Sequence, residues 1–123
     1  MIAGTVNANL EATVPLVVVG TRSRRQQVEA VIDTGFTGYL TLPPSIIATL
    51  QLTWLGREQG ILADGSVDNF DVYRGAVIWD GQPRAIEVEA VNAEPLVGMT
   101  LLERHSLRID VVSGGTVSIN SLP

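Results

Sequence analysis

Short apolar segments rich in Val and Ile recur along the chain, and residues 27–33 alternate between polar and apolar positions with the two-residue period of a β-strand before they become wholly apolar. Gly, Asn, Asp and Pro bound these segments, and these residues favour turns. Two segments, 57–73 and 73–91, each contain an Asp-Gly pair, which is a favoured two-residue hairpin turn. The hairpin turns are predicted at Asp64-Gly65 and Asp80-Gly81, and further strands over residues 4–10, 13–19, 27–33, 39–43, 96–98, 107–112 and 116–120.

Two short segments have the spacing of helices instead. Residues 43–52 carry Ile46, Ile47 and Leu50 at helical spacing after Pro44, which is tolerated in a first helical turn. A second short helix is predicted to begin after Thr100. In that helix Thr100 is the N-cap, Glu103 completes a capping box, and the apolar residues are Leu101 and Leu102.

About nine strands and two short helices are expected in all. Strands do not alternate with helices in the manner of a parallel doubly wound sheet. A length of 123 residues suits one hydrophobic core. The sequence therefore predicts a single all-β domain over residues 1–123.

Composition narrows the function. The net charge is −5, and the basic cluster of Arg22, Arg24 and Arg25 is interpreted as a solvated hairpin tip, so no nucleic-acid partner is expected. The chain has no Cys, which excludes disulfides and thiolate chemistry. No apolar run is long enough to span a membrane and no signal peptide is recognised at the N-terminus, so a cytoplasmic protein without membrane contact is expected.

Few residues offer catalytic chemistry. The single histidine, His105, is predicted on the last turn of a helix in a surface or capping role. No zinc site, serine nucleophile elbow or phosphate-binding loop is present, and no metal or cofactor is expected. What remains is Asp33-Thr34-Gly35, in which a carboxyl group directly follows an apolar strand.

An acid in this position has two interpretations. In the plainer one, Asp33 closes an Asx turn in its own loop. In the other, it is half of a pair: two carboxyl groups about 3 Å apart share one proton and activate a water. Because the chain contains one such tripeptide, a pair requires a symmetric homodimer.

These residues resemble those of the retropepsin-like aspartic proteases, and within them the bacterial clan AA group. The similar segments, in order, are AVIDTGFTGYLTLP, the short helix PSIIATLQL, LADGS at the place of the flap hairpin, and EPLVGMTLLERHSLRID. The resemblance covers nearly the whole chain. It implies a small closed barrel of the retropepsin (acid protease) type with one or two short helices.

The resemblance also implies roles for individual residues. Asp33 is expected to be catalytic, Thr34 to bond across the dimer axis, and Gly35 to contact the substrate backbone. Phe36 and the flap tip are expected to face substrate, and a short apolar segment to pack behind the Asp33 loop. The flap-tip residues are Ala63, Asp64 and Gly65, and the packing residues are Leu96, Val97 and Gly98.

The chain departs from the family pattern at three positions. Phe36 stands where a small residue is common, and Thr37 and Met99 replace an acid and an arginine that form an ion pair in retroviral relatives. Substrate and dimer contacts are therefore expected to differ. The C-terminal segment 117–123 is a candidate for strands at the dimer interface.

Two functions are weighed. The first is an aspartic endopeptidase, active as a homodimer, that hydrolyses a peptide or protein held extended in its cleft without metal. The alternative is a dimerisation or peptide-binding module of the same fold with weak or no catalysis, since a fold does not determine a function.

Overall fold

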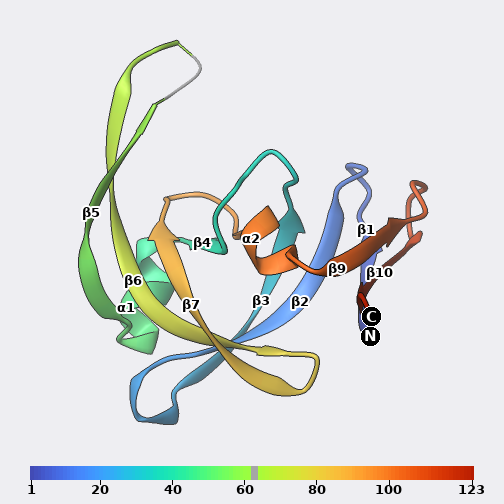
Figure 1. The fold of residues 1–123 in the computed structure, drawn as a ribbon, viewed down its shortest axis with the longest axis horizontal. Helices are drawn as coiled ribbons and strands as arrows, with labels where there is room; N and C mark the ends of the chain where they lie inside the picture. The colour runs from blue at the N-terminus through green and yellow to red at the C-terminus, as the bar shows by residue number, and fades with distance from the viewer. Residues whose placement is uncertain (62–63) are drawn as a thin grey trace.

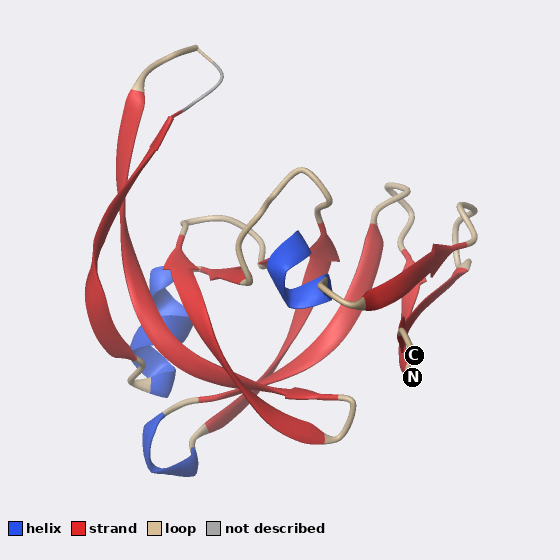
Figure 2. Ribbon diagram, in the orientation of Figure 1, coloured by secondary structure: helices blue, strands red, loops and turns tan. Residues whose placement is uncertain are grey.

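The computed structural model describes residues 1–61 and 64–123, and this part of the chain is mostly β-structure (Figure 1, Figure 2). Its strands are β1 Ile2–Val6, β2 Ala12–Val19, β3 Arg25–Ile32, β4 Leu40–Leu42, β5 Thr53–Ile61, β6 Val67–Trp79, β7 Gln82–Ala90, β8 Leu96–Val97, β9 His105–Ile109 and β10 Thr116–Ser121. The helical segments are the α-helices α1 Pro44–Leu50 and α2 Met99–Leu102 and the 3-10 turn η1 Thr21–Ser23.

All ten of these strands belong to one sheet, in the order β5-β6-β7-β4-β8-β3-β2-β1-β10-β9. Strand β6 also pairs with β2, so β6, β7, β4, β8, β3 and β2 form a closed ring of strands. The strand content and the single sheet confirm the predicted all-β class.

The ring encloses the main hydrophobic core. Strand β2 alternates, so that Val14, Leu16 and Val18 are buried while the residues between them are more exposed. Helix α1 adds Ile47 and Leu50 to the same cluster. The helix begins at Pro44, whose fixed φ suits a first helical turn.

Strands β1, β9 and β10 extend the sheet beyond the ring and carry both chain termini (Figure 1). Residues 117–119 pair with β1 on one side and with β9 on the other. This part of the candidate dimer segment 117–123 therefore has no free edge for a strand of a second chain.

Strand β5 and the first half of β6 form a two-stranded arm that rises from the ring (Figure 1). Its last pair among the described residues is Ile61 with Val67. The two-residue turn predicted at Asp64-Gly65 is wrong, because a type I′ turn requires positive φ at both residues and only Gly65 has it, at 84°. The predicted turn at Asp80-Gly81 is confirmed: both residues have positive φ, 52° and 82°, as a type I′ hairpin requires.

Three further expectations are corrected. The strand predicted over residues 4–10 ends at Val6, because the next residues form a turn closed by the Asn7 side chain. Helix α2 begins after Gly98, and Thr100 does not cap it with its side chain. His105 begins strand β9 rather than ending a helix.

No helix among residues 1–61 and 64–123 has the length and apolar character needed to cross a membrane.

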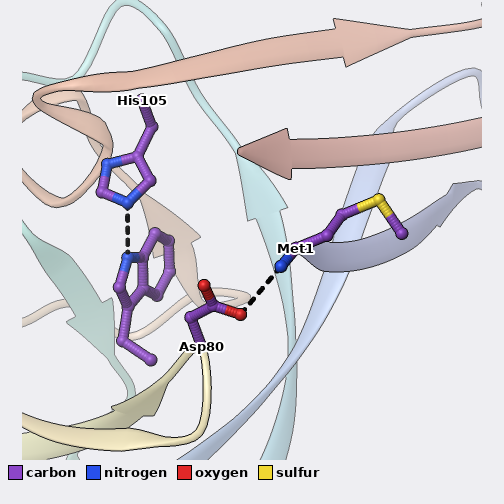
Figure 3. Close-up of polar contacts among 4 residues, drawn as sticks. Met1, Asp80 and His105 are labelled. Carbon is purple, nitrogen blue, oxygen red and sulfur yellow. Dashed lines mark hydrogen bonds and ion pairs between the residues drawn. The ribbon is translucent and has the colours of Figure 1, made fainter. Parts of the chain in front are cut away.

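Two polar contacts connect distant segments near the turn between β6 and β7 (Figure 3). The indole N–H of Trp79 donates to Nε2 of His105 at 3.0 Å, and Nδ1 of His105 lies 2.8 Å from the Glu103 carbonyl oxygen. A neutral ring with its proton on Nδ1 satisfies both contacts. The ammonium group of Met1 pairs with Asp80 at 2.9 Å, and both partners are exposed to solvent.

We expect His105→Phe to lower the free energy of unfolding by about 1–3 kcal/mol, because the substitution leaves the Trp79 N–H without an acceptor. Trp79 is only 6% exposed. Urea unfolding followed by circular dichroism measures the change. Asp80→Asn is the control: it removes an exposed ion pair, and its midpoint should stay close to that of the wild type. Equal losses of unfolding free energy in the two variants would contradict a stabilising role for the Trp79–His105 hydrogen bond.

Candidate functional site

Asp33 lies directly after strand β3, where the neighbouring strand β8 holds it. The backbone N–H of Asp33 donates to the Val97 carbonyl oxygen at 2.9 Å. Strand β8 runs parallel to β3 and antiparallel to β4, so it lies between them. The loop 33–39 therefore joins two strands that flank β8, and Val97, which is fully buried, anchors it from behind.

The loop also has its own hydrogen bonds. The Gly35 N–H donates to Oδ1 of Asp33 at 2.9 Å, and the Phe36 N–H donates to the Asp33 carbonyl oxygen at 3.1 Å. The Asx turn of the plainer interpretation is thus present. It orients the carboxyl group, which is half-buried, while Thr34 and Gly35 are exposed at the tip of the loop.

The other side of the loop is joined to the start of helix α2. Three of the four bonds join backbone groups on both sides, so they fix the path of the loop with little dependence on side chains. The bonds run from Gly98 N–H to Tyr39 O (3.0 Å), from Met99 N–H to Phe36 O (2.8 Å), from Thr100 N–H to Gly38 O (3.2 Å), and from the Thr100 hydroxyl to Thr37 O.

Phe36 packs inward against two glycines. A Cβ atom at Gly38 would lie 2.5 Å from Cζ of Phe36, and one at Gly98 would lie 2.6 Å from its Cδ2. A Cβ at Gly98 would also lie 2.2 Å from the Gly38 carbonyl oxygen. The half-buried ring therefore rests on backbone that only glycine leaves open, and Phe36 supports the loop from within the chain.

Two of the three predicted flap residues, Asp64 and Gly65, lie apart from this loop. Ala63 is outside the described residues. Asp64 and Gly65 are exposed in the connection 62–66, and Figure 1 shows this end of the arm standing clear of the loop 33–39. Hydrogen bonds from the hydroxyl and the N–H of Ser66 lower the pKa of Asp64. Asp64 is thus an ionised, solvated group at the arm's end.

Glu89 adjoins the site, although no sequence motif marks it. A Cβ at Gly38 would lie 3.4 Å from its Oε1, which places the carboxyl group beside the loop. Partial burial raises the pKa of Glu89 above its ordinary value of 4.5, and the negative charges of Glu58 and Glu87 raise it further. Alternation in β7 could have placed Glu87 and Glu89 on one face, but not beside this loop.

Comparison of the chain with protein-family models, with curated proteins and with solved structures gives no match. Within the described residues, no group of three or more His, Asp or Glu side chains is placed to hold a metal ion.

The glycine contacts predict a specific coupling. We expect Gly38→Ala to lower the free energy of unfolding by about 2 kcal/mol, because its Cβ meets the Phe36 ring, and Gly98→Ala by about 3 kcal/mol, because its Cβ also meets backbone. In a Phe36→Ala background, Gly38→Ala should become nearly neutral, whereas Gly98→Ala should remain costly. A double-mutant cycle by urea unfolding measures both couplings.

If Gly38→Ala lowers the free energy of unfolding equally with Phe and with Ala at position 36, the contact between the residue 38 Cβ and the Phe36 ring is contradicted. The Gly98→Ala variant serves as the internal control, because the Gly38 carbonyl oxygen stays in place in either background.

A second prediction concerns Glu89. Since its pKa is raised in the folded chain, the folded state binds this proton more tightly than the unfolded state does. The contribution of Glu89 to the free energy of unfolding should therefore fall as pH rises from about 4.5 through the raised folded pKa. Glu89→Gln, which cannot ionise, should match the wild type at pH 4 and exceed it in thermal midpoint at pH 7. If the thermal midpoints of Glu89→Gln and the wild type differ by the same amount at pH 4 and pH 7, the ionisation of Glu89 does not affect stability as predicted.

Proposed function

We propose that this chain is an aspartic endopeptidase of the retropepsin-like type. It acts as a homodimer, and its ring of strands is the closed barrel of that fold. Its substrate is a peptide or protein segment held in extended conformation, and the reaction uses no metal or cofactor. The catalytic group is the carboxyl group of Asp33, one from each protomer.

The observation that carries the proposal is the way in which Asp33 is held. Its N–H donates to the carbonyl oxygen of the buried residue Val97 in β8, and its Oδ1 accepts from the Gly35 N–H at 2.9 Å. One side-chain oxygen is thus oriented by the loop, and Asp33 is a half-buried residue that keeps some contact with solvent. A positioned, partly accessible carboxyl group on a rigid support is what acid–base catalysis requires.

A second carboxyl group comes from symmetry. Thr34 and Gly35 are exposed at the tip of the loop, so a two-fold axis near this tip would bring two Asp33 side chains face to face. The pair would share one proton. The ionised member takes a proton from the attacking water while the protonated member donates to the carbonyl oxygen of the scissile bond.

The arm formed by β5 and β6 is the proposed binding surface for the peptide backbone. Its two strands leave the ring as a hairpin with exposed residues near its end. An extended peptide can add to such a hairpin through backbone hydrogen bonds, with side chains entering pockets on alternate sides.

We expect Asp33→Asn to lower peptide cleavage by at least about a thousandfold, the scale on which removal of an acid–base pair slows catalysis. The Asx-turn bond to Gly35 can form with an Asn side-chain oxygen, so the variant should fold as the wild type does. Cleavage of a peptide library, read by mass spectrometry, measures the loss. Cleavage by a pure, folded Asp33→Asn sample at the wild-type rate would contradict the proposal.

The same samples separate the enzyme from a peptide-binding module. Specific activity of the wild type should fall on dilution below the dimer dissociation constant, which light scattering measures independently. Peptide binding by the wild type without any Asp33-dependent cleavage would favour the module.

A further inference from the structure

A cavity of about 380 Å³ lies between the arm and the end of β7. Gly60 and Ile61 of β5 and residues 68–70 of β6 line one wall, and residues 89–92 line the other. Among these, Ile61, Phe70, Ala90 and Val91 supply apolar surface. The volume suits one or two amino-acid side chains rather than a large cofactor.

Charge in this cavity is of one sign. Glu89 and Asp68 line it, and no arginine does. Within the described part of the chain, the carboxylate of Glu89 forms no ion pair, since the ion pairs found involve Asp71, Asp80 and Asp110. Partial burial and the charges of Glu58 and Glu87 disfavour its ionised form. A cation entering the cavity would relieve that cost.

The cavity is also next to the Asp33 loop. Glu89 pairs with Thr41 of β4, the strand into which the loop leads, and its Oε1 lies beside Gly38. A peptide lying along the loop with its backbone against the arm would therefore direct a side chain toward Glu89. Apolar walls suit the methylene stem of a long basic side chain, whose charged end reaches the carboxylate.

We propose that this cavity is a specificity subsite that binds an arginine or lysine side chain of the peptide substrate, with Glu89 as its recognition residue. The inference rests on the proposed function, because it assumes that a peptide lies along the Asp33 loop. It assigns a substrate class to the site: peptides with a basic residue at one fixed distance from the scissile bond.

The test measures binding apart from catalysis. An Asp33→Asn chain is titrated at pH 7 with fluorescent peptides whose other residues and ends are uncharged. Each peptide carries a single Lys, or a single Met as the uncharged match, at each position in turn. At one position Lys should bind about fivefold more tightly than Met, which corresponds to about 1 kcal/mol. Adding Glu89→Gln should remove that preference.

Glu87→Gln is the matched control. It removes the same charge from the same strand, but Glu87 does not line this cavity. It should therefore keep the preference for Lys. The subsite is overturned if the preference for Lys survives Glu89→Gln, or if Glu87→Gln removes that preference to the same extent. It is also overturned if no position in the peptides favours Lys, or if none of the peptides binds.

Failure of the proposed function gives a different result. In that case the wild type does not cleave the tightest-binding Lys peptide in an Asp33-dependent way, whatever the binding data show. Cleavage of Lys and Met peptides at equal rates, abolished by Asp33→Asn, would uphold the protease and reject the subsite.

Discussion

Gly98 approaches the loop that carries Asp33 so closely that one added carbon atom would collide with its backbone. A Cβ at Gly98 would lie 2.2 Å from the Gly38 carbonyl oxygen and 2.6 Å from the Phe36 ring. This contact sets how near helix α2 and strand β8 come to the loop. Because the hydrogen bonds between them need that distance, the position of Asp33 depends on the absence of a side chain some sixty-five residues away.

The ring of strands makes this approach possible. Strand β8 has only two residues, yet it pairs with β3 on one side and β4 on the other. The loop between β3 and β4 must therefore pass over its end, which brings residues 33–39 against Gly98. A short strand in the middle of a closed sheet is held on both edges. It makes a rigid support for a group that must keep its orientation.

Local features of the site could be read from the sequence, whereas its long-range contacts could not. An apolar strand that ends in Asp-Thr-Gly predicted the place of Asp33 and a tight loop. Thr100 shows the limit: its spacing to Glu103 predicted a helix cap, but its hydroxyl binds the Thr37 carbonyl group of a distant loop instead. Glu89 was missed because its proximity to Gly38 follows from the parallel pairing of β4 with β7.

The same contacts limit how two protomers of the proposed enzyme can meet. Residues 117–119 are already paired on both edges, so these residues cannot add to a sheet in the partner. Exposed groups beside Asp33 are Thr34 and Gly35 at the loop tip and Met99, which is 46% exposed at the start of α2. Met99 is bonded through its N–H to Phe36. A two-fold contact over this surface would therefore rest on the scaffold that orients the carboxyl group, so dimer formation and alignment of the acids would be one event.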